Sequence, residues 1–154
     1  MKIVLQRVSS ASVTVNRRRI SRIREGLLLL VAVEKGDTEE DARYLSAKIA
    51  KMRIFPDSRG KMNRSLLDIK GEVLAVSQFT LAAEWRKGNR PSFVKAAKPE
   101  YAVQLLKHFT QNLQQQGVRS VREGAFGEHM KVSLCNNGPV TIVMSRNTTT
   151  DSPQ

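Results

Sequence analysis

Apolar residues in the first part of the chain occur in short runs that are typical of β-strands. Residues 2–8 and 12–16 are rich in β-branched side chains and are separated by small polar residues, so we predict two short strands. Residues 27–33 form an uninterrupted apolar run between a glycine and a charged segment. A strand that is covered on both faces has this composition, so we expect 27–33 to lie in the core.

Two later segments show the spacing of helices that bury one face. After the capping residues Asp37 and Thr38, apolar side chains recur at three- and four-residue steps as far as Met52. A second segment of this kind begins near Pro99 and ends at Gly117. Each segment predicts a helix that packs on the rest of the domain.

The remaining apolar runs complete the predicted fold. They lie at 72–81, 118–121, 130–135 and 140–144, and each predicts a strand. The order of strands, helix, strand, helix and strands predicts a single α/β domain of largely antiparallel β-sheets covered by two main helices. We place this domain at residues 1–146, because the tail 147–154 is polar and is expected to be disordered.

The far end of the predicted strand 72–81 carries a polar pair. Side chains alternate between the faces of a strand, so Gln78 and Thr80 would lie side by side on one face. Two interpretations are open. The pair forms the wall of a pocket, or both side chains bond to neighbouring backbone.

The segment 136–141, Asn-Asn-Gly-Pro-Val-Thr, is a second candidate site. Asn and Gly tolerate positive φ, so a tight turn at 136–138 is an adequate interpretation. The alternative is a cis peptide bond before Pro139, which would aim two successive carbonyl oxygens in nearly the same direction. Such a pair could hold an ammonium group.

The charge of the chain narrows the class of partner. The sequence has 26 Lys plus Arg against 14 Asp plus Glu, a formal net charge of +12, and nucleic acid is the usual polyanion for such a domain. Two segments concentrate this charge. The run 17–24 is interpreted as an exposed hairpin arm or a solvated loop, and the loop 82–91, with Trp85 among its basic residues, as an RNA-facing edge or a solvated loop.

The sequence offers few groups for side-chain catalysis. Cys135 is the single cysteine, so no disulfide can form within the chain, and with only His108 and His129 beside it we predict no metal and no cofactor. We interpret Cys135 as a small core residue, with a nucleophile as the alternative, and His108 as a surface residue. The apolar runs are too short to cross a membrane, and we expect a cytoplasmic protein.

Two segments together identify a family resemblance. The segment 77–81, Ser-Gln-Phe-Thr-Leu, and the segment 136–141 resemble the two signature motifs of the D-aminoacyl-tRNA deacylases. The match extends to residues 6–8, 11–13, 33–37, 60–63, 86–93, 126–127 and 130–134. It covers nearly the whole chain up to the polar tail.

The resemblance implies a fold, a reaction and a partner. It implies a homodimer with active sites at the subunit interface, which hydrolyses the ester between a D-amino acid and the terminal adenosine of tRNA, and also mischarged glycyl-tRNA. It further implies that Gly138-Pro139 is cis and enters the neighbouring subunit's pocket. Backbone carbonyls there would hold the α-amino group and exclude L side chains.

The resemblance also implies roles for individual residues. Thr80 and Gln78 are taken as pocket residues rather than nucleophiles, because an unassisted threonine hydroxyl needs a base and the family assigns activation to the 2′-hydroxyl of the tRNA. Arg7 is expected to hold the Gly138-Pro139 segment in place. The remaining expected substrate contacts are Ser77, Phe79, Phe126 and Met130.

The sequence departs from the family pattern at two places, outside the invariant part of the signatures. Asn137 stands where many relatives have aspartate, and Glu84-Trp85 replaces a common Asp-Thr pair. The second change lies in the loop that is expected to face tRNA, so the resemblance implies the reaction more firmly than the choice among tRNAs. A different class of function is also compatible with the charge and with the loop 82–91. This alternative is a basic RNA-binding module without turnover.

Overall fold

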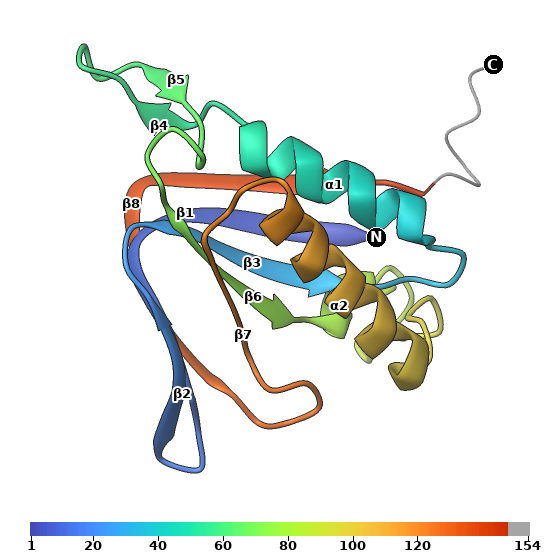
Figure 1. The fold of residues 1–154 in the computed structure, drawn as a ribbon. Coiled ribbons are helices and arrows are strands. Elements are labelled where there is room, and N and C mark those ends of the chain that lie inside the picture. Colours follow the sequence, from blue (N-terminus) through green and yellow to red (C-terminus); the bar gives the residue numbers. More distant parts are fainter. Residues whose placement is uncertain (148–154) are drawn as a thin grey trace, which may run out of the picture.

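A computed structural model describes residues 1–147, and its core is a six-stranded mixed sheet covered by two helices (Figure 1). The strands of this sheet are β1 (Lys2–Val15), β2 (Arg18–Ile23), β3 (Gly26–Ala32), β6 (Glu72–Ser77), β7 (Ser120–Glu123) and β8 (Lys131–Ser145). The helices are α1 (Glu39–Lys51) and α2 (Pro99–Gln115). The predicted single α/β domain with two main helices is confirmed. The predicted disordered tail, apart from Asn147, lies outside the described residues.

Strand β1 organises the antiparallel half of the sheet. It pairs with β3 and β2 along one edge and with β8 along the other. One register runs from Lys2 opposite Ala32 to Ala11 opposite Ile23, so β2 and β3 behave as one interrupted strand. The predicted break between two short strands at 9–10 is therefore wrong, because ladder partners on both edges keep β1 extended through it.

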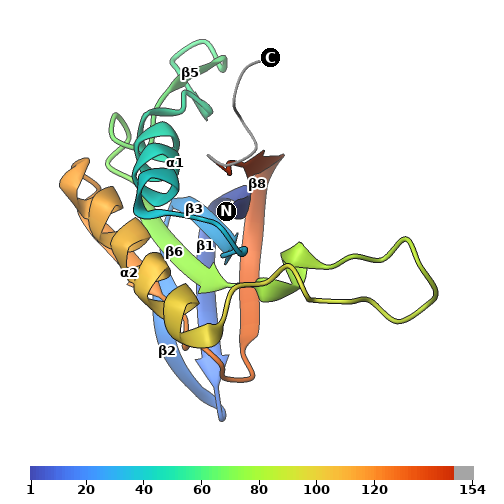
Figure 2. The same cartoon turned by 90° about the vertical axis from the view of Figure 1, so that its right-hand side faces the viewer.

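The parallel half of the sheet places the helices. Strand β6 pairs in parallel with β3, and β7 pairs in parallel with β6. Parallel neighbours need a crossover, and α1 and α2 supply the two crossovers. Both run in the same direction across the sheet and connections of one hand are favoured, so both helices cover the same face, as Figure 2 shows.

Local signals explain both helices. Thr38 caps α1 in a reciprocal pair with Asp41, and the buried residues Ala42, Leu45 and Ile49 form its inner face. A proline lies in the first turn of α2, and its inner face includes Leu105, Leu106, Phe109 and Leu113. These faces and the facing side of the sheet form the larger core cluster. The opposite side of the curved sheet encloses a smaller one.

Three short elements complete the described part of the chain. The strands β4 (Phe55–Pro56) and β5 (Met62–Arg64) form a hairpin after α1, and η1 (Phe79–Ala82) is a 3-10 helix after β6. Figure 2 shows η1 and the loop that follows it projecting away from the body of the domain.

Strand β8 runs along the whole of β1, and the predicted turn at 136–138 is wrong. Gln6 pairs with Thr141 and Val8 pairs with Asn136, so Arg7 alone stands opposite residues 137–140. Pro139 has no N–H to donate, and the strand bulges where it cannot continue the ladder. The glycine-proline segment is therefore a bulge within a strand.

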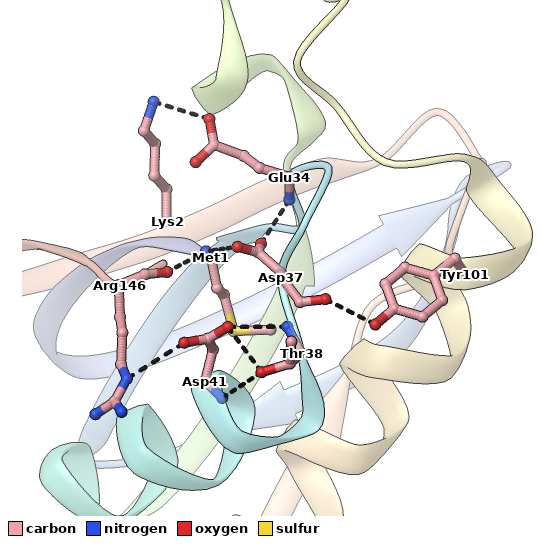
Figure 3. Close-up of polar contacts among 8 residues, drawn as sticks. All are labelled: Met1, Lys2, Glu34, Asp37, Thr38, Asp41, Tyr101 and Arg146. Carbon is pink, nitrogen blue, oxygen red and sulfur yellow. Dashed lines mark hydrogen bonds and ion pairs between the residues drawn. The ribbon is translucent and has the colours of Figure 1, made fainter. Parts of the chain in front are cut away.

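A buried polar cluster joins the ends of several elements (Figure 3). The Met1 amine donates to the Asp37 carboxylate and to the Arg146 carbonyl, the latter at 2.5 Å. Arg146 pairs with Asp41 of α1 at 3.2 Å, and the Tyr101 hydroxyl of α2 donates to the Asp37 carbonyl at 2.7 Å. Burial raises the pKa of the Asp37 carboxyl. The cluster fixes the edge of the sheet against both helices.

Candidate active site

The segment after β6 differs from the predicted strand 72–81. β6 ends at Ser77, which lies opposite Val31 near the end of β3, and the Gln78 amide makes a last bond to the Val31 carbonyl at 2.7 Å. Beyond that point β3 offers no further ladder partner, and the chain turns into η1. The argument from strand alternation is therefore wrong for Gln78 and Thr80.

The turn nevertheless brings Gln78 and Thr80 together. The Gln78 side-chain amide donates to the Thr80 hydroxyl at 2.5 Å, so the interpretation of two side chains bonded only to backbone is wrong. This bond occupies one of the two lone pairs of the hydroxyl oxygen, and a threonine hydroxyl also needs a base to become a nucleophile. Among residues 1–147, no histidine or carboxylate accepts a hydrogen bond from the Thr80 hydroxyl. The geometry fits a polar contact for substrate better than a nucleophile.

An apolar cavity of about 310 Å³ lies beside this turn. Ser77, Phe79 and Phe126 line it on one side, and the start of α2, including Ala102 and Leu106, lines the other. The rings of Phe79 and Phe126 are 57% and 40% exposed, although both are large and apolar. Exposed aromatic rings at the mouth of a cavity suit the stacking of a flat group such as a nucleobase.

Met130 lies behind the segment that carries Phe126. Its sulfur accepts from the Ala125 amide at 3.3 Å, and a Cβ added to Gly124 would come within 2.7 Å of it. Met130 packs against the smaller core cluster and is not among the residues that line the apolar cavity. Its contacts therefore fit a role in positioning the 124–127 segment.

The second candidate segment is built around Arg7. The Gly138-Pro139 peptide bond is cis, and residues 136–139 are exposed on the bulge of β8. The buried Arg7 guanidinium donates to the Asn137 carbonyl at 2.7 Å and to the Ile54 carbonyl at 2.6 Å. A Cβ on Gly138 would lie 2.8 Å from its Nη2 atom. Only glycine leaves room for the guanidinium at this place.

The structure does not bring the two segments together within one chain. Three strand spacings, about 14 Å, separate β8 from β6 across the sheet. Arg7 pairs with Leu27 whereas Ser77 pairs with Val31, so the segments are also about 13 Å apart along the strands. Figure 1 shows the bend of β8 and the end of β6 at different ends of the sheet.

The loop after η1 is held at its base. The Glu84 and Ser92 backbones exchange two hydrogen bonds, and the Glu84 carboxylate bonds to the Arg86 amide and to Lys95. These bonds, the Arg86 amide first, lower the pKa of Glu84. Trp85 is 70% exposed beside the Arg86 guanidinium. The loop 82–91 is thus anchored at one end and presents basic and aromatic groups to solvent.

Sequence reasoning missed several parts of these sites. The cavity wall includes Ala96 and Ala97, which no pattern marks, and Leu106, which shows only as part of a helical stripe. The Ile54 carbonyl that holds Arg7 leaves no trace in the sequence, because any residue supplies a carbonyl. Cys135 was predicted as a core residue and is exposed on β8. Val132, in the same part of β8, packs against the smaller core cluster, and Cys135 lies on the opposite face of the strand because side chains alternate.

The rest of the described chain adds no competing site. His108 lies on the surface and pairs with Glu39 at 3.2 Å, which confirms its prediction as a surface residue. Within residues 1–147 no group of three or more His, Cys, Asp or Glu side chains is placed to bind a metal ion. No helix in that part of the chain combines the length and apolarity needed to span a membrane.

Solved structures with the same fold cover almost the whole chain. The c-Myc DNA unwinding element binding protein superposes with a TM-score of 0.89 and 38% identity, over 95% of this chain and 99% of that one. A probable eukaryotic D-amino acid tRNA deacylase superposes with a TM-score of 0.80 over 93% and 97%. It is 18% identical, so the likeness shows the fold alone.

Sequence comparisons agree on one family. The chain is 54% identical to the D-aminoacyl-tRNA deacylase of Bacillus pumilus, over 94% of this chain and 97% of that protein. It is 49% identical to the D-aminoacyl-tRNA deacylase of Flavobacterium johnsoniae, over 94% and 96%. The family model described as D-Tyr-tRNA(Tyr) deacylase matches residues 4–145. With both signature segments inside that match, the chain belongs to the D-Tyr-tRNA(Tyr) deacylase family.

Proposed function

We propose that this protein is a D-aminoacyl-tRNA deacylase that hydrolyses the ester between a D-amino acid and the 3′-terminal adenosine of tRNA. A water oxygen adds to the ester carbonyl, the bond from that carbon to the ribose oxygen breaks, and the ribose oxygen takes up a proton. The observation that carries this proposal is the family match over residues 4–145, with the apolar cavity directly beside the first signature segment. We expect it to act in the cytoplasm, where aminoacyl-tRNA is used.

The cavity beside Ser77 is the proposed site for the terminal adenosine. Phe79 and Phe126 line it with partly exposed rings, and its walls are otherwise mostly aliphatic. The Phe79 ring is held in an edge-to-face contact with Phe93. Stacking of a base on an aromatic side chain contributes about 1–3 kcal/mol. The ester, one ribose away from the base, would then lie near the Gln78–Thr80 pair.

The proposed activating group belongs to the substrate. The Thr80 oxygen already accepts a hydrogen bond from Gln78, and His108 is paired with Glu39 on the outer surface of the helices. The 2′-hydroxyl of the terminal ribose is adjacent to the ester and can direct the water or take part in the proton transfer. In this proposal the protein holds the ester and the 2′-hydroxyl in the reactive geometry and excludes other geometries of the substrate.

Handedness is proposed to be read by a second copy of the chain. The Gly138 bulge lies far from the Gln78–Thr80 turn of its own chain, and its exposed backbone is free to enter a neighbour. Carbonyl oxygens there would accept hydrogen bonds from the α-ammonium group of the substrate. These bonds would fix the direction in which the side chain of the amino acid points. An L side chain would then meet the bulge, whereas a D side chain or the hydrogen of glycine would not.

The bulge needs a rigid support for this task. Arg7 holds it from below by the bonds to the Asn137 and Ile54 carbonyls, and hydrogen bonds from a charged donor contribute about 1.5–3 kcal/mol each. We therefore assign Arg7 a positioning role within its own subunit. It is not proposed to touch the substrate.

One assay tests the proposal. The protein is incubated in parallel with D-tyrosyl-tRNA, L-tyrosyl-tRNA and glycyl-tRNA, and the remaining ester is measured over time. Loss of the D and glycyl esters with survival of the L ester is expected. Equal loss of the D and L esters would contradict the proposed discrimination.

A non-catalytic RNA-binding module remains the alternative function, favoured by the exposed Trp85 and Arg86 on the anchored loop. It predicts binding of tRNA with no loss of any ester. A binding measurement alone does not separate the two functions, because electrostatic binding falls with salt in both.

A further inference from the structure

A chain of connected hollows leads away from the apolar cavity. A larger hollow of about 660 Å³ shares Ser77, Leu106 and Phe126 with the cavity and runs between α2, β7 and the middle of β2. It shares Arg122 with a third hollow, which shares Arg24 and Glu72 with a fourth. We call these last three hollows the α2–β7 groove. It begins at the proposed adenosine site and ends beside Lys70 and Arg119.

The α2–β7 groove is strongly cationic. Its lining contains six exposed basic residues, Lys70, Lys107, Arg22, Arg24, Arg119 and Arg122, against two carboxylates. Both carboxylates are engaged, since Glu72 bonds to Arg24 and Glu123 accepts from the Thr110 hydroxyl at 2.5 Å. Arg24 is paired with Glu72, but within the described residues the other five basic side chains form no ion pair, so these five are available for an anion. A row of cations suits the regular spacing of phosphates.

The near end of the groove also offers uncharged recognition groups. The Ser21 hydroxyl is buried and has no hydrogen-bond partner within the described residues, and it lines the 660 Å³ hollow with Gln111 and Gln114 of α2. A buried hydroxyl without a partner is costly unless a ligand satisfies it. Amides and hydroxyls of this kind can bond to base edges and to ribose, which phosphate-binding cations cannot do.

We propose that the α2–β7 groove binds the tRNA strand upstream of the terminal adenosine, an inference that rests on the proposed deacylase function. The larger hollow has about twice the volume of the adenosine cavity, so it has room for the two cytidines that precede the terminal adenosine. Lys107 and Arg122 face their phosphates. Arg119 and Lys70, at the far end, face the first phosphates of the acceptor stem.

Two double substitutions separate the ends of the groove. Lys107→Ala with Arg122→Ala removes the cations nearest the adenosine cavity, and Lys70→Ala with Arg119→Ala removes those at the far end. The control is Arg59→Ala with Lys61→Ala, which removes two exposed cations from the β4–β5 hairpin, outside the groove. Each protein is assayed on D-tyrosyl-tRNA, on the D-tyrosyl ester of the trinucleotide CCA and on that of adenosine.

The groove predicts a different pattern for each pair. The near pair should raise KM about tenfold on tRNA and on the CCA ester, and leave the adenosine ester unchanged. The far pair should raise KM on tRNA only. Binding of uncharged tRNA by fluorescence anisotropy should show a smaller salt slope, by about 0.7 for each single-strand phosphate and about 0.9 for each duplex phosphate that the variant no longer neutralises. The control pair should match the unsubstituted protein in every assay.

Several results would contradict the proposal that the α2–β7 groove binds tRNA. If KM and the salt slope are unchanged in both double variants, the groove does not bind tRNA. An equal loss of activity on all three esters would indicate a general structural defect and would also contradict the proposal. A change of mass in sedimentation equilibrium would assign this face to contacts between copies of the chain. Failure of the proposed function is a separate result, because the unsubstituted protein would then bind uncharged tRNA and cleave none of the three esters.

Discussion

Substituting Gly138 with alanine tests the support of the β8 bulge most directly. The glycine has φ +139°, a conformation that side-chain-bearing residues rarely adopt. The new Cβ would lie 2.8 Å from Arg7 Nη2 and 3.1 Å from the Val140 backbone nitrogen. The first contact is too short to be tolerated, so Arg7 or the bulge must move.

The structure sets the scale of the effect. Backbone strain at such a φ costs about 1–3 kcal/mol. Arg7 is buried and held by two charged hydrogen bonds, and breaking one of them costs about 1.5–3 kcal/mol. We therefore expect the free energy of unfolding to fall by a few kcal/mol. If the bulge moves by about 1 Å instead, the rate on the D ester should fall about 100-fold.

The assay compares single-turnover hydrolysis of D-tyrosyl-tRNA with urea unfolding of the same preparation. Gly60→Ala is the matched control, because its φ is +76° and its Cβ would meet nothing within 4 Å. The control introduces backbone strain without the clash and should keep its activity. A folded Gly138→Ala protein with a rate within twofold of the unsubstituted protein and an unchanged free energy of unfolding would refute the argument.

Three further predictions concern the Gln78–Thr80 turn, the apolar cavity and two surface carboxylates. Thr80→Ala should keep activity within about tenfold, whereas loss of a true nucleophile costs about 10⁶-fold, so a complete loss in folded protein would restore the nucleophile mechanism. Phe126→Ala should raise KM for D-tyrosyl-tRNA by about tenfold or more with little change in kcat. An unchanged KM would contradict the proposal that the adenine binds in this cavity. The pKa values of Asp57 and Asp68 are lowered by hydrogen bonds, first from Asn63 and from the Ser65 amide, so their stabilisation is present above pH ~4 and is lost as the pH falls further. Urea unfolding of the Asp57→Asn and Asp68→Asn variants should therefore depend less on acid pH than that of the unsubstituted protein, and an equal dependence would contradict this.

The parts of the fold that depend on local sequence could be predicted. Helix α1 carries its own capping pair at Thr38 and Asp41 and its own apolar stripe, so its start and its buried face are visible without knowledge of the rest. The buried strand β3 is equally visible as an uninterrupted apolar run. Both predictions needed only neighbours within a few residues.

The parts that depend on distant partners could not. The end of β6 at Ser77 is set by the end of β3, more than forty residues earlier, and not by any residue of β6. Likewise the pairing of 131–145 with β1 converts an apparent turn into a bulge and exposes Cys135. Gln78 and Thr80 do lie together, as predicted, although the strand geometry used to pair them was wrong.

The distance between the Gly138 bulge and the Gln78–Thr80 turn has a consequence for mixtures of damaged proteins. In the proposed dimer, each site consists of the bulge of one copy and the turn of the other. A substitution that damages the bulge and a substitution that damages the turn can therefore affect different sites of one dimer. Subunits with a damaged bulge, exchanged with subunits carrying a damaged turn, would form hybrids in which one site inherits both lesions and the other inherits neither. Two inactive preparations, randomly reassorted, should recover about a quarter of the intact sites. Complementation of this kind is impossible for an enzyme that keeps its whole site in one polypeptide.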